Sequence, residues 1–112
     1  MKPELEFFPT ADVPYTSCPG SVTGLTERVL ATARPAVATR VLRFAPGTDT
    51  SENGVQVHDF WEEVYILEGS ILDLRLGRTF SAGAYACRPP GMPHGPWTSE
   101  GGCLTFEVRY DG

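Results

Sequence analysis

Glycine and proline interrupt this chain so often that short strands are favoured over long helices. Its 112 residues include 12 glycines and 10 prolines, and turns rich in these residues separate short β-prone runs. No segment keeps the apolar period of about 3.6 residues through three turns. The best helical candidate, residues 26–33, is followed by Arg34-Pro35 and also fits a strand, which we favour. The pattern predicts an all-β barrel or jelly roll.

We expect eight or nine strands, each with one side facing the core. They would cover residues 4–8, 25–32, 37–44, 54–58, 62–68, 70–76, 84–88, 93–97 and 103–110. A chain of this length has room for one core. We therefore predict a single domain, residues 1–112, in which residues 1–24 form an N-terminal strand and irregular arm and residues 25–110 form the barrel.

The charge and cysteine content argue against several classes of protein. The net charge is −5, and the arginines are spread along the chain, so neither nucleic acid nor an anionic membrane is an expected partner. Three cysteines without CxxC spacing indicate neither a disulfide framework nor a thiolate zinc site. The N-terminus lacks the pattern of a secretory signal, and no apolar run reaches the length of a membrane span. We expect a cytoplasmic protein.

The two histidines of the chain each lie in a segment that suggests a metal site. In GVQVHDFWEEVYILEG, residues 54–69, His58 precedes Glu62 by four residues across an expected bend between strands. In GAYACRPPGMPHGPW, residues 83–97, His94 follows a Pro-Pro-Gly turn, in which proline restricts the backbone and glycine permits the bend. Two imidazoles and one carboxylate that converge in a β-barrel predict a divalent metal site.

Gln56 is a candidate fourth ligand, because it projects to the same side of its strand as His58. Its neutral amide oxygen would be a weak donor to a transition metal. Two histidines and a carboxylate are typical of open non-haem iron sites, which leave positions for substrate, water or dioxygen. The competing interpretation is that His58 and His94 are ordinary surface or core residues. Because both histidines lie in such segments and Glu62 accompanies them, we favour the metal site.

Both segments resemble the two sequence motifs of the cupin superfamily, G-x5-H-x-H-x3,4-E-x6-G and G-x5-P-x-G-x2-H-x3-N. The residues that match in type and spacing are His58, Glu62 and Gly69 in the first motif and Gly83, Pro89, Gly91 and His94 in the second. The segments EEVYILEG, residues 62–69, and RPPGMPHGPWTSEGGC, residues 88–103, are most similar in sequence to small single-domain cupins related to the cupin module of ChrR-type anti-sigma factors. The resemblance covers residues 37–110.

The chain departs from the motifs at three positions. Gln56 stands where the first motif has its leading histidine, and Thr98 stands where the second ends in asparagine. The leading glycine is displaced, because Gly54 lies too close to the ligand pair and Gly47 fits the start poorly. The first departure removes one of the four usual ligands, so the analogy with cupin oxygenases that use three histidines is weakened.

The resemblance implies a conical β-barrel with a metal in its mouth, held by His58, Glu62, His94 and, less securely, Gln56. It also implies a homodimer in which N-terminal strands pack across the interface. The apolar N-terminal run ELEFF, residues 4–8, fits this expectation, because an unpaired apolar edge favours aggregation.

Residues near these motifs suggest a substrate pocket. Phe60, Trp61 and Trp97 flank the expected ligands and would form either an apolar wall for a substrate or ordinary barrel packing. Arg88 would either neutralise an acidic substrate or pair with Asp73 or Glu107. Cys87 and Cys103 are expected to be small apolar fillers rather than nucleophiles.

The leading functional hypothesis is a metal-dependent oxidoreductase, an Fe(II) dioxygenase that acts on a small aromatic or diketone-like molecule. His58 and His94 would anchor the metal, and Glu62 would be both a ligand and a catalytic group that exchanges protons with substrate. The alternatives are a metal-dependent isomerase, lyase or hydrolase with Zn²⁺, Mn²⁺ or Ni²⁺, a non-catalytic ligand-binding or sensory module, and a barrel that has lost its metal. Fold alone does not choose among them.

Overall fold

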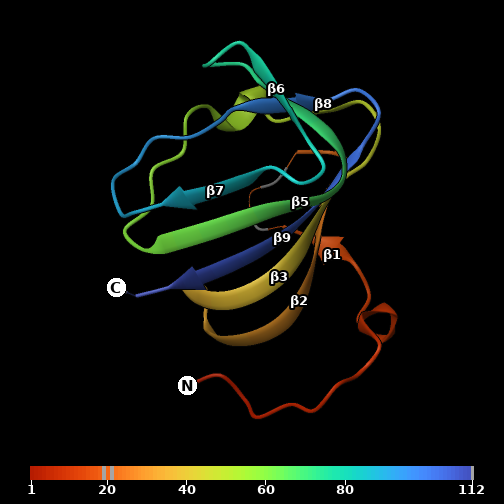
Figure 1. The fold of residues 1–112 in the computed structure, drawn as a ribbon, viewed down its shortest axis with the longest axis vertical. Helices are drawn as coiled ribbons and strands as arrows, with labels where there is room; N and C mark the ends of the chain where they lie inside the picture. Colours follow the sequence, from red (N-terminus) through yellow and green to blue (C-terminus); the bar gives the residue numbers. More distant parts are fainter. Residues whose placement is uncertain (19, 21, 112) are drawn as a thin grey trace.

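The structure, a computed structural model that describes residues 1–18, 20 and 22–111, is built almost entirely from antiparallel strands (Figure 1). The strands are β1 (Thr16–Ser17), β2 (Leu25–Arg34), β3 (Val37–Phe44), β4 (Thr48–Asp49), β5 (Trp61–Asp73), β6 (Arg78–Ser81), β7 (Tyr85–Arg88), β8 (Trp97–Ser99) and β9 (Cys103–Tyr110). Two short 3-10 helices, η1 (Thr10–Asp12) and η2 (Ser51–Asn53), complete the secondary structure. Neither is long or apolar enough to cross a membrane, and no other helix occurs among the described residues. The predicted all-β class is confirmed.

Strand β5 connects the two halves of the barrel. The hydrogen-bonded order is β1-β2-β3-β9-β5-β8-β4, and β6 and β7 also pair with β5. Residues 61–69 of β5 pair with β7 and β9, whereas residues 70–73 pair with β6 and β8. The bend between these parts is at Gly69, where a Cβ atom would lie 2.1 Å from the carbonyl oxygen of Gly102. Only glycine fits there, so Gly69 bends one long strand instead of separating two strands as we had expected.

The inward side chains of β3, β5, β7 and β9 form layers that change from charged to apolar. In order, the layers are Arg88–Glu62–Arg109, Val64–Glu107–Arg40, Ile66–Thr105–Leu42 and Phe44–Cys103. We call Arg40, Glu62, Arg88, Glu107 and Arg109 the charged end of the barrel. The apolar end consists of the buried cluster Leu42, Phe44, Ile66, Ile71 and Cys103. The apolar end supplies the hydrophobic core, and the charged end holds the candidate site.

Several predicted strands differ from the observed ones. Residues 4–8 form no strand, because no described segment of the chain pairs with them and a strand needs a hydrogen-bonding partner. The N-terminal arm instead meets β3 through a 2.8 Å hydrogen bond from Lys2 Nζ to Thr39 Oγ1. Residues 54–58 and 93–97 are mostly irregular, and only Gln56 and His94 form a bridge there. Strand β6 was not predicted.

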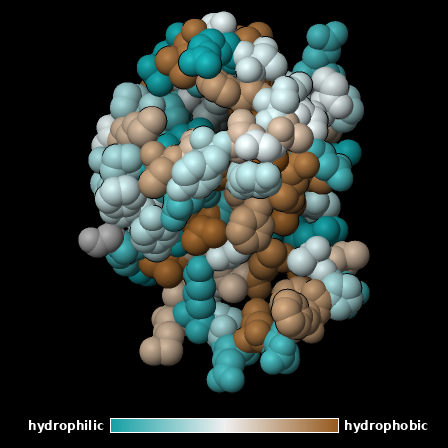
Figure 2. Space-filling view, in the orientation of Figure 1, coloured by the Kyte–Doolittle hydropathy of each residue, from teal (hydrophilic) through white to brown (hydrophobic). Residues whose placement is uncertain are grey.

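The outer face of the sheet carries a row of exposed aromatic residues. One row across β7, β5 and β9 consists of Tyr85, Tyr65 and Phe106, whose exposed fractions are 60%, 46% and 36%. Figure 2 shows hydrophobic atoms gathered over the middle of the visible face of the molecule, with hydrophilic atoms below them.

Candidate metal centre

Backbone hydrogen bonds between two loops hold His58 and His94 beside each other. The segments that carry them precede β5 and β8. Gln56 and His94 exchange two backbone hydrogen bonds of 2.7 and 3.0 Å, and the amide of Gly91 donates to the carbonyl of His58 at 2.9 Å. These bonds join segments that lie more than 30 residues apart. The positions of both imidazoles therefore depend on the same pair of loops.

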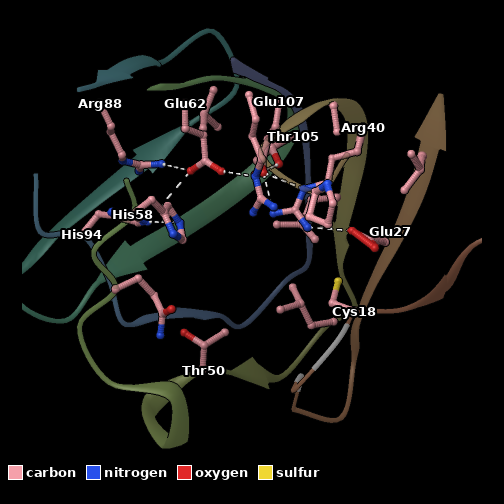
Figure 3. Close-up of a pocket in the computed structure, with 18 of the residues that line it drawn as sticks. Cys18, Glu27, Arg40, Thr50, His58, Glu62, Arg88, His94, Thr105 and Glu107 are labelled. Atoms are coloured by element: carbon pink, nitrogen blue, oxygen red, sulfur yellow. Dashed lines mark hydrogen bonds and ion pairs between the residues drawn. The ribbon is translucent and has the colours of Figure 1, made fainter. Parts of the chain in front are cut away.

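The structure brings the three predicted ligand residues together. Nε2 of His58 lies 3.1 Å from Nε2 of His94, which lies 3.9 Å from Oε1 of Glu62. One potential ligand atom from each residue falls within 4.8 Å of the others. Figure 3 shows both imidazoles and the carboxylate of Glu62 directed toward a common centre. Two nitrogens bound at about 2.1 Å, at nearly a right angle, would be about 3 Å apart, so the observed spacing fits a bound ion.

Hydrogen bonding to His94 favours the tautomer that a metal requires. Nδ1 of His94 lies 3.2 Å from the carbonyl oxygen of Met92. Because a carbonyl oxygen only accepts, Nδ1 carries the proton in this bond, and Nε2 of the neutral ring presents its lone pair to His58. Burial lowers the pKa of both histidines, which favours this neutral form.

Two arginines hold the carboxylate of Glu62. Arg109 Nε donates to Oε2 at 2.8 Å, and Arg88 Nη1 donates to Oε1 at 3.2 Å. Burial of Glu62, which is 3% exposed, raises the pKa of its carboxyl, but the charges of Arg109, Arg40 and Arg88 outweigh this and lower the pKa overall. Glu62 is therefore an anion, the form that binds metal.

The guanidinium groups are themselves positioned by aromatic rings. Arg88 lies over Trp97, 5.4 Å from the ring centroid, and Arg109 lies over Phe60 at 5.0 Å. Phe60 also stacks on the ring of His58, with centroids 4.5 Å apart. Such contacts fix the direction of a guanidinium at modest energetic gain.

A second charged group lies deeper in the barrel, centred on Arg40. Its Nη1 donates to Glu27 at 2.8 Å, and its Nε and Nη2 approach Oε1 of Glu107 at 2.9 and 2.8 Å. Thr105 Oγ1 donates to the other oxygen of Glu107 at 2.9 Å. This charged group was not predicted from the sequence. The available signal was strand alternation, which places Thr105, Glu107 and Arg109 on one face of β9.

Both groups line one cavity of about 650 Å³, a size suited to a small molecule (Figure 3). Trp97 lines this cavity, and its role as a substrate-pocket residue stays a prediction. Phe60 is not among the lining residues and packs behind His58. Trp61 departs further from the predicted pocket position. It precedes the inward Glu62 on β5, so its side chain lies on the outer face, where its ring stacks on that of Tyr110 with centroids 6.2 Å apart.

Gln56 lines the cavity beside His58. Its amide nitrogen donates to the carbonyl of Asn53 at 2.7 Å, so only the amide oxygen is left for a metal. Its role as a ligand stays a prediction.

Two other sequence expectations have structural outcomes. Arg88 was expected to pair with Asp73 or Glu107, but it pairs with Glu62, the residue opposite it in the β5–β7 register. Cys103 is buried in the apolar end, as expected for a filler, and burial raises its pKa to about 11. Cys87 is exposed on β7, because it alternates with the inward Arg88.

The fold is shared with solved cupins at low sequence identity. An RmlC-like cupin from Shewanella frigidimarina is 18% identical, with a TM-score of 0.73 over 97% of this chain and 93% of that one. An acetylacetone dioxygenase from Acinetobacter johnsonii is 17% identical, with a TM-score of 0.71 over 96% of this chain and 73% of that one. The complex of SigE with the anti-sigma factor ChrR from Rhodobacter sphaeroides matches at 20% identity and a TM-score of 0.68, over 88% of this chain and 50% of that one.

At these identities the structural matches establish the fold and leave the activity open. No curated protein matches the chain. The family model of the ChrR cupin-like domain matches residues 4–110, which is nearly the whole sequence. It agrees with the resemblance seen in the two motifs and with the β-barrel. The chain belongs to the ChrR cupin-like family.

Proposed function

We propose that this protein binds one divalent metal ion through His58, Glu62 and His94 and uses it to act on a small organic molecule. The observation that supports the proposal is the 3.1 Å separation of two imidazole nitrogens beside a buried carboxylate. Neutral imidazoles and an ionised carboxylate are the protonation states that metal binding needs. Gln56 is the candidate for a weak fourth ligand.

Fe(II) is the favoured metal, because two histidines and one carboxylate with open positions are typical of non-haem iron oxygenases. When bound, Fe(II) would supply the one-electron chemistry that dioxygen activation requires. Zn²⁺, Mn²⁺ or Ni²⁺ in the same site would instead suit an isomerase, lyase or hydrolase.

The proposed substrate is a small aromatic or diketone-like molecule. The cavity has the volume for one, and Trp97 offers it an apolar wall. Glu62, besides serving as a metal ligand, would exchange protons with the substrate. The acetylacetone dioxygenase of similar fold supports this class of reaction by analogy only.

A non-catalytic sensory role is the second candidate. The observation that favours it is the family itself, because ChrR is an anti-sigma factor that was solved in complex with SigE. In such a protein, metal or ligand binding would change a partner-binding surface.

Metal analysis of the untagged protein, reconstituted anaerobically with Fe(II), tests the proposal. We expect about one iron per chain in the wild type and little in His94→Ala or Glu62→Gln, because each variant removes one ligand. Glu63→Gln is the matched control, since Glu63 is the next residue on the same strand and hydrogen-bonds Tyr85 and Tyr110 on the outer face.

Oxygen consumption separates the candidate functions. Iron-dependent uptake with a diketone or a small aromatic substrate supports the dioxygenase, whereas tightly held zinc without uptake supports the sensory module or a hydrolase. No binding of any of the four metals would refute the proposal.

Gln56→His should tighten metal binding if residue 56 faces the ion, and an unchanged affinity would remove Gln56 from the ligand set.

A homodimer is also proposed. The exposed row Tyr85, Tyr65 and Phe106 and the exposed arm residues Leu5 and Phe7 offer apolar surface that a second copy would cover. Light scattering of the wild type should give twice the chain mass, and Tyr65→Ser/Phe106→Ser should give the monomer. A monomeric wild type would refute the dimer.

A further inference from the structure

Arg88 and a bound metal would compete for the same oxygen atom. Oε1 of Glu62 is the carboxylate oxygen that lies 3.9 Å from Nε2 of His94, so it is the one available to an ion between the histidines. The same oxygen accepts the hydrogen bond from Arg88 Nη1 at 3.2 Å. A guanidinium carries only donors and is repelled by a cation. Because the ion repels the guanidinium, metal binding at Oε1 weakens this ion pair and frees Arg88 to turn toward another anion.

We propose that Arg88, released from Glu62 by metal binding, binds the negative charge of a small organic anion that has an apolar body. The anion would occupy the cavity with its charged group beside the metal centre. This inference rests on the proposed function, because it requires a metal ligated by Glu62. It narrows the substrate class from small molecules in general to anions such as carboxylates or enolates.

The charges that line the cavity support an anionic ligand. Glu27, Glu62 and Glu107 face Arg40, Arg88 and Arg109, so these three acidic and three basic groups balance. The remaining lining arginine, Arg34, pairs with the exposed Asp111. A divalent ion held by neutral histidines adds two positive charges to this balanced and largely buried set. An anionic ligand would compensate part of that excess.

Of the three half-buried arginines, Arg88 is the one whose ion pair a metal would weaken. Arg40 is held by two carboxylates, Glu27 and Glu107, neither of which belongs to the metal centre. Arg109 bonds Oε2 of Glu62 at 2.8 Å, which is compatible with a metal at Oε1. Arg88 makes the longest of these contacts with a carboxylate, 3.2 Å, and has that single ion pair among the described residues.

Trp97 would keep the released guanidinium beside the site. Arg88 lies over its ring, and the same ring lies 5.6 Å from that of His94. The cavity continues from this point past Val64, Leu42 and Ile71, which are apolar. A ligand with its charge at Arg88 would therefore place its remaining atoms against an apolar wall, as small-molecule sites commonly do.

Calorimetric titration with Zn²⁺, followed by titration of the loaded protein with benzoate, tests the inference without any turnover. Benzoate combines an anionic group with an apolar ring, and benzamide is the uncharged control. Arg88→Met should weaken benzoate binding to the Zn²⁺-loaded protein by about tenfold or more, the loss expected for one charge-assisted hydrogen bond. Arg88→Lys, which keeps the charge, should lose less. Arg34→Met, at the lining arginine that pairs with the exposed Asp111, should change nothing.

The zinc titrations distinguish the two proposals. We expect Arg88→Met to bind Zn²⁺ at least as tightly as the wild type, because a competitor for Oε1 is gone. Weaker zinc binding by Arg88→Met would overturn the competition between Arg88 and metal. Normal zinc binding with equal benzoate affinity in wild type and Arg88→Met, or with benzamide bound as tightly as benzoate, would overturn only this inference. A wild type that takes no zinc or other divalent metal would refute the proposed function as well. Circular dichroism of each variant verifies that it is folded.

Discussion

The charged end and the apolar end of the barrel lie on the same strands but are held together by different forces. Leu42 and Phe44 at the apolar end remove hydrocarbon from water, which is favourable wherever they pack. Glu62 and Glu107 at the charged end are 3% and 5% exposed, and each is stable there only because arginines neutralise it. Buried ion pairs contribute little net stability, so the apolar end accounts for the stability of the fold and the charged end points to a function.

The boundary between the two ends runs through a single layer. Thr105 lies opposite Leu42 and Ile66, is 1% exposed and donates its hydroxyl hydrogen to Glu107. On one side of this layer the inward residues need shape complementarity, and on the other side they need partners of opposite charge. Substitutions on the apolar side should therefore destabilise the fold by leaving cavities, and those on the charged side by leaving buried charges unpaired.

The largest expected effect is at the apolar end. Phe44→Ala should lower the free energy of unfolding by about 4 kcal/mol, because it removes a buried aromatic ring and leaves a cavity. Urea unfolding measures the change. The metal affinity of the molecules that remain folded should not change, and a loss below about 1 kcal/mol would contradict the assignment of Phe44 to the core.

A somewhat smaller loss is expected from breaking the charge network. Arg40→Met should cost about 3 kcal/mol, because it leaves Glu27 and Glu107 without their cation in a largely buried position. The double variant Arg40→Met/Glu107→Leu should recover part of this loss, since one uncompensated charge is gone. If the double variant is less stable than Arg40→Met, the network contributes net stability and the two ends differ less in what stabilises them.

At the boundary we expect an effect of about 1.5 kcal/mol. Thr105→Val keeps the volume but removes the hydroxyl that donates to Glu107, and the cost of a lost hydrogen bond to a charged group is of this size. Unfolding by urea gives the value. The matched variant Thr79→Val, at an exposed threonine of β6, should lie within about 0.5 kcal/mol of the wild type.

The smallest expected effect is a change in the pH dependence of the metal-free protein. Burial lowers the pKa of His58 and His94 in the folded state, whereas the unfolded chain keeps a pKa of about 6.5. Between the two pKa values the unfolded state binds more protons, so the free energy of unfolding decreases as pH falls from about 6.5 toward the lowered folded-state values and then levels off. His58→Asn should flatten the decline between about pH 7.5 and 5. An identical slope in wild type and variant would contradict the burial of His58.

Much of the candidate site was predictable because it lies in short motifs. The intervals between His58, Glu62 and Gly69, and the Pro-Pro-Gly turn before His94, are local features that the sequence displays directly. The structure brings His58, Glu62 and His94 together as expected. The bounds of β3 and β9 also agree with the predicted 37–44 and 103–110, since their alternation is regular.

The inward face of β9 could not have been predicted from alternation alone. Simple hydrophobic patterning would direct Leu104 and Phe106 to the core, yet the inward residues are Cys103, Thr105 and Glu107. In β9 an apolar set of residues alternates with a more polar set, but alternation alone does not show that the more polar set faces a charged cavity. The register with Arg40 on β3 and Glu62 on β5 decides this.

The sequence by itself determined the all-β class, the family and the three residues that could hold a metal, because turn chemistry and ligand spacing are local properties of the chain. Only the tertiary structure decided which arginines surround Glu62, that residues 4–8 form no strand within one chain, and that Trp61 lies outside the cavity. Those features depend on strand pairing across tens of residues. Pairing partners are selected by the energy of the whole sheet, which no short segment encodes.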